Sequence, residues 1–432
     1  MTSNIAAILA RQIWDSRGRP TVEAEVRLEN GAVGRAIAPA GASRGAHEAI
    51  DLRDGGEAYG GMGVAKAVAN VAGEIAPALT GMDARDQAAI DRALIELDGT
   101  PDKARLGGNA VVAVSMAVLH AAAAAARAPL WRYLADRRKV RVPLPEIQIF
   151  GGGAHAGRRT DIQDFMVMAP RAGSFRRALE MTEAVYRAAG QLMEALGPLS
   201  GVADEGGWWP NFASNEQALD TLTRAIERAG FRAGEDVFIS LDIAANELGD
   251  ANGYRLALDD RRLDGAAMAR EVIGWTKRYP VLSIEDPAAQ DDFATMATVT
   301  RAVGEAVQVI GDDVLVTSAA RVARAAKAGA CNAALVKVNQ VGTVTEARDA
   351  LEAARAQGWG MIVSARSGET EDVTIAHLAT GWDAGQLKVG SFTRSERMAK
   401  WNEMLRIEEE LGADAVFAGA SAFAAPIAAR LG

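Results

Sequence analysis

Cysteine is almost absent from the sequence. Cys331 is the single cysteine among 432 residues, so the chain can form neither a disulfide framework nor a zinc site built from cysteines. Positive charge is also in short supply, since 47 Lys and Arg stand against 56 Asp and Glu, a formal net charge of −9. Phosphate backbones are bound by clustered Lys and Arg, so this balance argues against nucleic acid as a partner. It still allows local basic pockets.

Long hydrophobic runs are scarce too. The most apolar stretch, residues 110–126, contains Ser115 and His120 and is shorter than the roughly 20 residues that span a bilayer. We therefore predict a buried helix that stops near Pro129, and no membrane partner. The first residues show no basic segment followed by an apolar core, so we expect no signal peptide and a cytoplasmic location.

Residues 1–138 have the pattern of a small α+β domain. Residues 21–28 alternate apolar and polar side chains, as a half-buried antiparallel strand does. Asn30-Gly31 is a strong hairpin signal before a return strand at 33–38. A glycine-rich loop follows at 39–45, and helical periodicity begins near residue 63. Strands followed by helices favour a separate α+β domain.

Residues 143–432, which begin at the boundary Pro143-Leu144-Pro145, alternate helices with short apolar strands. We expect helices at 175–196 and 215–229, and strands at 237–241, 281–284, 307–310, 333–336, 360–363 and 386–387. Continuous apolar strands separated by helices predict an α/β fold with a parallel sheet, and so many units in succession favour a barrel. No GxGxxG pattern follows a strand and opens a helix, which counts against a dinucleotide-binding fold.

Charged residues stand at the ends of the six expected strands. The first three strands end in acids and the last three are followed by bases, namely Asp242, Glu285, Asp312, Lys337, Arg366 and Lys388. In a barrel these ends meet on one rim, which carries the active site. Three neighbouring carboxylates repel one another unless a cation neutralises them, and Mg²⁺ prefers such oxygen ligands. A purely structural network of acids and lysines is the alternative.

The basic half of this rim suits an anionic substrate. Arg366 can bind phosphate or carboxylate through two parallel hydrogen bonds. A lysine flanked by other cations and a metal has a lowered pKa and can act as a base. Metal, lysine and anion pocket together indicate proton abstraction beside a carboxylate, with the metal holding the enolate charge.

At these residues the chain resembles enolase over nearly its whole length. The matching segments follow one another in the family's order: 15–23, 41–43, 155–156, 204–207, 283–286, 311–313, 337–343, 366–372 and 388–391. The resemblance implies an enolase-type (β/α)8-like barrel at 143–432 and an N-terminal α+β capping domain at 1–138, which carries a mobile active-site loop. It also implies a carbon–oxygen lyase that removes water, and a homodimer or homo-octamer.

The resemblance further implies the roles of individual residues. Asp242, Glu285 and Asp312 would bind a catalytic Mg²⁺, and Ser43 on the mobile loop would bind a second, substrate-linked Mg²⁺. The catalytic residues would be Lys337 as the base, Glu205 as the acid that helps the hydroxyl leave, and Asp164. A small phospho- or phosphono-carboxylate would be held by His155, Gln163, Arg366, Ser367 and Lys388.

The sequence departs from the family pattern within this site. Ala365 stands where enolases usually have His, Asp164 where they have Glu, and Arg44 where they have Thr. A missing imidazole opens volume, Asp164 retracts its carboxylate by roughly 1.5 Å, enough to break a direct contact, and Arg44 adds a cation beside the phosphate. We therefore expect a larger and more positive pocket, in which Ala365 and Arg44 face the substrate. Such changes alter specificity more than reaction class.

Three functions stay open at this point. The first is an ordinary enolase acting on 2-phosphoglycerate. The second is a specialised relative, for which the enolase-like carboxyphosphonoenolpyruvate synthase of phosphonate natural-product biosynthesis is a family precedent. The third is a non-catalytic enolase-like binding protein, which we expect to lose its metal ligands or base first. Since all of those residues are present, the sequence favours an enzyme.

Overall fold

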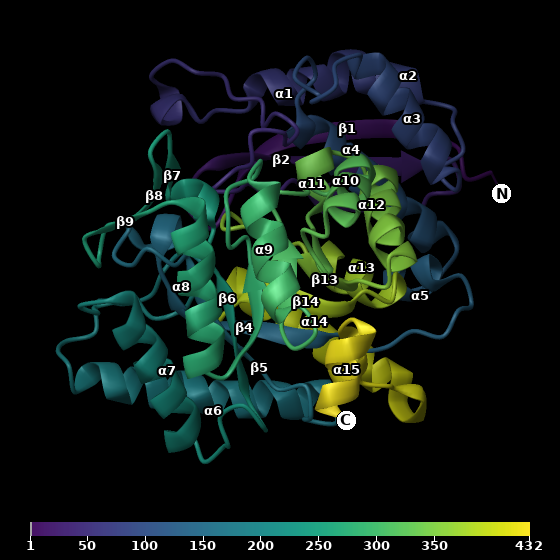
Figure 1. Ribbon diagram of the computed structural model, residues 1–432. Coiled ribbons are helices and arrows are strands. Elements are labelled where there is room, and N and C mark those ends of the chain that lie inside the picture. Colours follow the sequence, from purple (N-terminus) through teal and green to yellow (C-terminus); the bar gives the residue numbers. More distant parts are fainter. Residues whose placement is uncertain (1) are drawn as a thin grey trace.

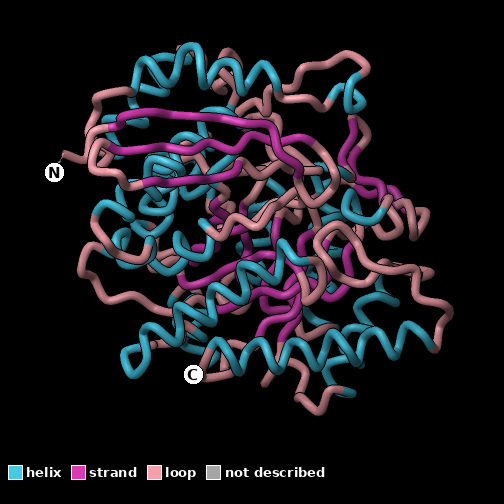
Figure 2. The backbone as a smooth tube through the Cα atoms, turned by 180° about the vertical axis from the view of Figure 1, so that it is seen from behind, coloured by secondary structure: helices cyan, strands magenta, loops and turns pink. Residues whose placement is uncertain are grey.

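The computed structural model describes residues 2–432. The N-terminal part begins with an antiparallel sheet of β1 (Ile5–Trp14), β2 (Pro20–Leu28) and β3 (Val33–Ile37), paired in that order. The predicted hairpin joins β2 to β3 at Gly31, which has a φ of 85°. The helices of this part are α1 (Ala65–Asn70), α2 (Ala76–Leu79), α3 (Gln87–Asp98), α4 (Gly108–Ala125) and α5 (Leu130–Ala135). In Figure 2 this sheet crosses the upper part of the molecule, below helices of the same part.

Helix α4 packs against β2 and β3 and is the core of this part. By length and composition it is apolar enough to cross a membrane, but 83% of it is buried inside the protein. The prediction of a buried helix is therefore confirmed. Its close approach to the sheet requires a glycine, because a Cβ on Gly34 would lie 2.1 Å from the backbone nitrogen of Ala121.

The second part is a closed eight-stranded barrel with helices around it (Figure 1), which confirms the predicted fold class. Its strands are β4 (Leu144–Gly151), β5 (Asp164–Met168), β6 (Phe238–Asp242), β10 (Val281–Glu285), β11 (Gln308–Gly311), β12 (Ala333–Val336), β13 (Gly360–Ser364) and β14 (Gly385–Gly390). The six expected strands correspond to β6 and β10–β14. A small outer sheet holds β7 (Gly249–Asp250), β8 (Gly253–Leu256) and β9 (Arg261–Leu263).

The six expected strands are parallel to their neighbours in this set, as predicted, but β5, which was not predicted from the sequence, differs from them. This strand runs antiparallel to both of its neighbours, β4 and β6. Parallel neighbours need a long crossover, usually a helix, whereas the β4–β5 connection contains only a 3₁₀ turn at Gly153–Ala156. The chain therefore returns alongside β4 in the opposite direction, and it carries His155 and Gln163 on that short connection.

Helices cover the outside of the barrel. They are α6 (Phe175–Glu194), α7 (Asn215–Arg228), α8 (Gly265–Arg278), α9 (Phe293–Val303), α10 (Ala319–Ala328), α11 (Val338–Val341), α12 (Val344–Ala356), α13 (Thr374–Gly381), α14 (Ser395–Leu411) and α15 (Ala425–Leu431). The predicted helices at 175–196 and 215–229 are α6 and α7. Both begin at a serine, Ser174 and Ser214, whose side chain accepts a hydrogen bond from the first turn.

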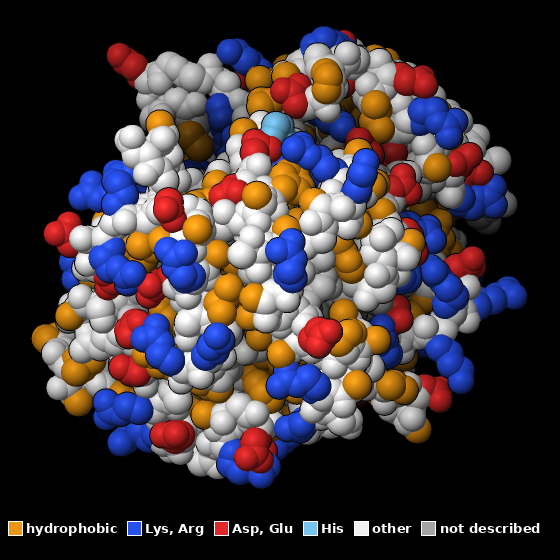
Figure 3. Space-filling view, in the orientation of Figure 1, with side chains coloured by type: hydrophobic (Ala, Val, Ile, Leu, Met, Phe, Trp, Pro, Cys, Tyr) orange, Lys and Arg blue, Asp and Glu red, His pale blue; other side chains and the backbone are white. Residues whose placement is uncertain are grey.

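The N-terminal part lies over the carboxyl ends of the barrel strands. Arg17 donates to the Ser367 hydroxyl at 3.1 Å, and Ala40 pairs with Gly368 through backbone hydrogen bonds. On the face seen in Figure 3, basic and acidic side chains are interspersed on the surface. The concentrated charge of this protein is instead buried beneath the N-terminal part, at the rim of the barrel.

Candidate active site

One cavity lies between the carboxyl ends of the barrel strands and the loop at 40–48. It is lined by Gly41, Ala42, Ser43, His155, Gln163, Asp164, Glu205, Asp242, Lys337, Ser364, Ala365, Arg366, Ser367 and Lys388. Most of the residues predicted from the sequence therefore come together here, although they are far apart in the chain. The free space measures about 20 Å³, enough for about one water molecule. A substrate can enter only after the loop or side chains move.

Three predicted residues do not line this cavity. Glu285 and Asp312 lie behind Lys388 and Lys337, whose ammonium groups bind their carboxylates. Arg44 points elsewhere: its guanidinium donates to the carbonyl of Ala49 at 3.3 Å and lines a separate small cavity. In this structure Arg44 therefore adds no positive charge to the cavity, contrary to our expectation.

The acidic half of the rim is neutralised by lysines. The ammonium of Lys388 lies 2.8 Å from Asp242 Oδ2 and 2.8 Å from Glu285 Oε2. Burial alone would lower the pKa of Lys388, but these two carboxylates raise it well above its ordinary value. Burial, followed by the neighbouring Asp242, raises the pKa of Glu285 well above its usual range. The ammonium of Lys388 opposes this rise in the pKa of Glu285 without cancelling it.

Whether these residues fit a divalent cation can be judged from their oxygens. Glu285 Oε1 is buried and has no hydrogen-bond partner among residues 2–432. The donors of Asp242, Glu285 and Asp312 are carboxylate oxygens only, which Mg²⁺ prefers. A buried, unpartnered oxygen within such a set fits a cation. In this structure the three carboxylates do not surround one common position for a cation, because the ammonium of Lys388 lies between Asp242 and Glu285.

Two other groups of carboxylates and histidine are already close together. In the described part of the chain, ligand atoms within 4.8 Å of one another occur in His155–Asp164–Glu205 and in Asp286–Asp312–Asp313. In the second group, Asp286 accepts from the backbone N–H groups of Asp312 and Asp313 at 2.9 and 2.7 Å. Asp286 therefore fixes the turn that presents Asp312 to the rim.

In the first group, His155 is hydrogen-bonded to Asp164 and lies at ion-pair distance from Glu205. Nδ1 of His155 lies 3.0 Å from Asp164 Oδ1, and its Nε2 lies 3.9 Å from Glu205 Oε1. Burial alone would lower the pKa of His155, but the carboxylates of Asp164 and Glu205 raise it to about 9. Burial raises the pKa of Glu205, which favours its protonated form. Gln148 also donates to Asp164 and accepts from the Gly207 N–H.

Arg366, the third base of the rim, is neutralised by the loop. Arg366 donates to both carboxylate oxygens of Glu48, at 2.9 and 3.2 Å, and to the Ser43 carbonyl at 3.1 Å. Asn339 Oδ1 accepts from the same guanidinium at 3.1 Å. The loop comes this close because residue 41 is a glycine, whose Cβ would otherwise lie 1.9 Å from Arg366 Nη2.

Sequence reasoning missed Glu48, Asn339, Gln148 and Arg17 as residues of this site. Glu48 and Asn339 each lie a few residues from a predicted site residue, Ser43 and Lys337, but their contacts become visible only in three dimensions. Arg17 belongs to the matching segment at 15–23, so its place in that segment was the available signal. All four hold other side chains in position.

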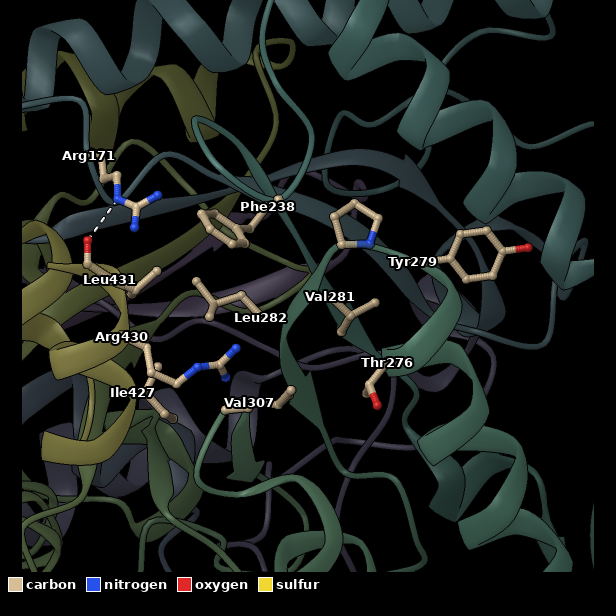
Figure 4. A pocket seen from close by; sticks show the side chains of 13 residues that line it. Arg171, Phe238, Thr276, Tyr279, Val281, Leu282, Val307, Ile427, Arg430 and Leu431 are labelled. Atoms are coloured by element: carbon tan, nitrogen blue, oxygen red, sulfur yellow. Dashed lines mark hydrogen bonds between the residues drawn. The ribbon is translucent and has the colours of Figure 1, made fainter.

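A larger cavity, of about 260 Å³, lies at the opposite end of the barrel. It is bounded by the first residues of β6 and β10 and by α15, with Phe238, Leu282 and Ile427 on its apolar wall (Figure 4). Arg171 lies at its edge and donates to the Leu431 carbonyl at 2.7 Å. None of the predicted residues lines this cavity, and barrel active sites lie at the other end of the strands.

Comparison with known protein families covers almost the whole chain. The family model described as the N-terminal domain of enolase matches residues 5–134. The model described as the C-terminal TIM barrel domain of enolase matches residues 139–426. These matches agree with the closed barrel and with the separate N-terminal sheet. The chain belongs to the enolase family.

Proposed function

We propose that this enolase-type lyase eliminates water from 2-phosphoglycerate or a close analogue to give an enolpyruvate, in a Mg²⁺-dependent reaction. The observation that carries the proposal is the composition of one buried cavity. Lys337 and Glu205 both line it, together with Asp242, Arg366 and Ser367. A base, an acid, a cation site and an anion site are the parts that this elimination needs.

The proposed reaction follows from what these side chains can exchange. In this structure Lys337 is an ammonium beside Asp312. Burial alone would lower the pKa of Lys337, but that carboxylate raises it, so the lowered pKa expected from the sequence is not found here. Once Lys337 has released this proton, its neutral Nζ accepts the proton α to the carboxylate, and the C–H electron pair becomes the new carbon–carbon double bond. The β-hydroxyl leaves as water with the proton of the Glu205 carboxyl group, whose raised pKa favours that protonated form. Lys388 neutralises the substrate carboxylate, while Arg366 and Ser367 hold the phosphate. His155, Gln163 and Asp164 complete the polar wall.

Asp242, Glu285 and Asp312 would hold the catalytic Mg²⁺, and Ser43 would bind the second, substrate-linked ion. When bound, such cations stabilise the negative charge that develops as the proton leaves. The residues of this chain orient the substrate and exclude water. Closure of the loop at 40–48 over the cavity excludes water, as lid closure does in other enzymes.

The first experiment is to measure phosphoenolpyruvate formation from 2-phosphoglycerate, with and without Mg²⁺. A Mg²⁺-dependent turnover of roughly 10 s⁻¹ or more supports an ordinary enolase activity. A rate about three orders of magnitude lower, in folded protein that binds Mg²⁺, supports a different phospho- or phosphono-carboxylate substrate. Absence of Mg²⁺-dependent phosphoenolpyruvate binding contradicts both proposals and supports a non-catalytic binding protein.

A specialised substrate is the second candidate, and Ala365 favours it. This small side chain lines the cavity and its N–H donates to the carbonyl of Lys388 at 2.9 Å, so it lies beside the proposed carboxylate site. A substrate with an additional acidic group, as in a carboxyphosphonoenolpyruvate synthase-like reaction, would use that place once the loop opens. Arg44 offers no support, since it lies outside the cavity.

We also propose that the protein is a cytoplasmic homo-oligomer, either a dimer or an octamer. The support is an exposed apolar edge on β1, where Leu9 is 42% and Trp14 is 55% exposed. Trp14 packs edge-on against Tyr59, with ring centroids 5.4 Å apart, which enlarges this edge. Light scattering of the purified protein tests the proposal, and a monomer mass contradicts it. Cell fractionation tests the compartment.

A further inference from the structure

Helix α14 carries a basic side chain that is buried behind the cavity without lining it. Arg397 is 0% exposed. Its Nη1 donates to the carbonyls of Arg366 at 2.6 Å and Val389 at 2.9 Å, and its Nη2 donates to the carbonyl of Ser367 at 2.6 Å. The three acceptors belong to the two proposed phosphate-binding residues and to the residue after Lys388.

All three hydrogen-bond acceptors of the Arg397 guanidinium are uncharged backbone carbonyls. The nearest carboxylate oxygen, in Glu396, lies 3.4 Å from its Nε, and that Nε has no hydrogen bond among residues 2–432. Burial of a guanidinium against backbone carbonyls costs free energy that an apolar side chain would not cost. A lysine could supply the charge, but it lacks the planar fork that reaches three separate carbonyls.

The aliphatic part of Arg397 also lies close to the backbone that contacts the segment of the proposed acid. A Cβ on Gly390 would lie 2.5 Å from the Glu205 carbonyl and 3.0 Å from Arg397 Cδ, so the chain passes tightly between the two. The next residue, Ser391, donates its N–H to the Glu205 carbonyl at 2.9 Å. Arg397 therefore contacts the backbone that carries the anion site and the backbone that fixes Glu205.

We propose that Arg397 is a positioning residue that sets the spacing between the phosphate-binding pair Arg366–Ser367 and the strand that carries Lys388. This inference rests on the proposed function, because it assumes that Arg366 and Ser367 bind an anion. The three hydrogen bonds fix the backbone of both segments at one point. The phosphate and the carboxylate of one substrate are thereby held at a constant separation.

The test uses Arg397→Lys and Arg397→Met in the full-length protein. Isothermal titration with phosphoenolpyruvate, in buffer that contains Mg²⁺, gives the dissociation constant. Steady-state kinetics separate KM from kcat, and thermal melting reports folding. We expect the Lys variant, which keeps the charge, to stay folded and to bind phosphoenolpyruvate about tenfold or more weakly, since small displacements of a site are expensive. Unchanged binding in a folded Lys variant overturns the proposal.

Arg355→Met is the matched control. Arg355 also donates to backbone carbonyls, those of Trp382 and Asp383, but it lies on α12 and does not line the cavity. We expect this variant to lose thermal stability without a change in phosphoenolpyruvate affinity. If the control weakens binding as much as Arg397→Lys does, a general loss of stability explains both results and the positioning role is wrong.

Arg366→Met separates this inference from the function on which it rests. If Arg366→Met leaves phosphoenolpyruvate binding unchanged, the proposed anion site itself is wrong. If it weakens binding while Arg397→Lys does not, only the positioning role is wrong. We expect both to weaken binding and the double variant to bind about as weakly as Arg366→Met alone, because coupled residues are not additive. Fully additive losses would show that Arg397 does not act through Arg366.

Discussion

The two charged halves of the cavity are neutralised by different kinds of structure. Lys388 lies on β14 and Lys337 directly follows β12, so the cations that balance the acidic half belong to the barrel. Glu48, the carboxylate that balances Arg366, belongs to the loop at 40–48. If that loop opens, Lys337 and Lys388 stay beside the acidic carboxylates, whereas Arg366 loses the carboxylate of Glu48. The barrel alone thus supplies the counter-charges of the acidic half, and the loop supplies that of Arg366.

The largest expected effect comes from removing the proposed base in the acidic half. Lys337→Ala should lower kcat by about 10³-fold, within the range that general bases contribute. Phosphoenolpyruvate formation measures the loss, and circular dichroism checks that the variant is folded. Full activity of Lys337→Ala with the true substrate would show that Lys337 is not the base.

A second substitution tests whether the acidic half holds a metal. Glu285→Gln replaces a fully buried carboxyl group, which has one unpartnered oxygen, with an amide that cannot ionise to bind a cation. Mg²⁺ affinity should fall by more than the roughly 10- to 100-fold that outer partners of a metal site contribute. Calorimetric titration with Mg²⁺ measures it, and the exposed Glu235→Gln is the control. Equal affinities in the two variants would place the metal elsewhere.

Substitution of Glu48 tests the anion half. Glu48→Gln leaves the buried guanidinium of Arg366 without its counter-charge, so the ligand-free protein should melt at a lower temperature. Inorganic phosphate can replace the lost charge, and it should therefore raise the melting temperature of Glu48→Gln more than that of the wild type. Equal phosphate effects in both proteins would show that Glu48 and the anion do not share Arg366.

The sequence was most informative where chemistry depends on strand ends. Asp242 and Lys388 could be placed on one rim because barrel strands all present their carboxyl ends there, whatever the details of packing. It was less informative where a side chain can turn. Arg44 is next to Ser43 in the chain, yet its guanidinium reaches the Ala49 carbonyl outside the cavity. Strand β5 was not predicted, and its short, mostly apolar sequence carries no signal that distinguishes an antiparallel strand from a parallel one.

Two departures from the family pattern should have unequal effects. Since Arg44 lies outside the cavity, Arg44→Thr should change KM by no more than about twofold, as for most substitutions away from a site. Ala365→His places an imidazole beside a free volume of about 20 Å³, so it should displace neighbouring groups and change substrate preference. Steady-state kinetics of both variants with 2-phosphoglycerate test these two expectations. A strong effect of Arg44→Thr would mean that Arg44 reaches the substrate in another loop position.

The smallest effect concerns two buried histidines with opposite pKa shifts. Carboxylates raise the pKa of His155 to about 9 against the effect of burial. Burial lowers the pKa of His377 to about 4, because Glu403, Asp372 and Glu410 oppose it too weakly and His120 adds to it. An unfolded histidine has a pKa of about 6.5. Between about pH 6.5 and 4 the unfolded chain therefore binds a proton that folded His377 does not, and stability should fall as the pH drops.

His155 adds nothing to that slope, because below pH 6.5 it is protonated in both states. Its stabilising contribution is complete there and is lost only as the pH rises toward 9. Urea unfolding of the wild type and of His377→Gln at several values between pH 7 and 5 isolates the contribution of His377. We expect the free energy of unfolding of the variant to fall less over this range. Parallel curves would mean that His377 is protonated alike in the folded and unfolded chain, so that burial does not control its charge.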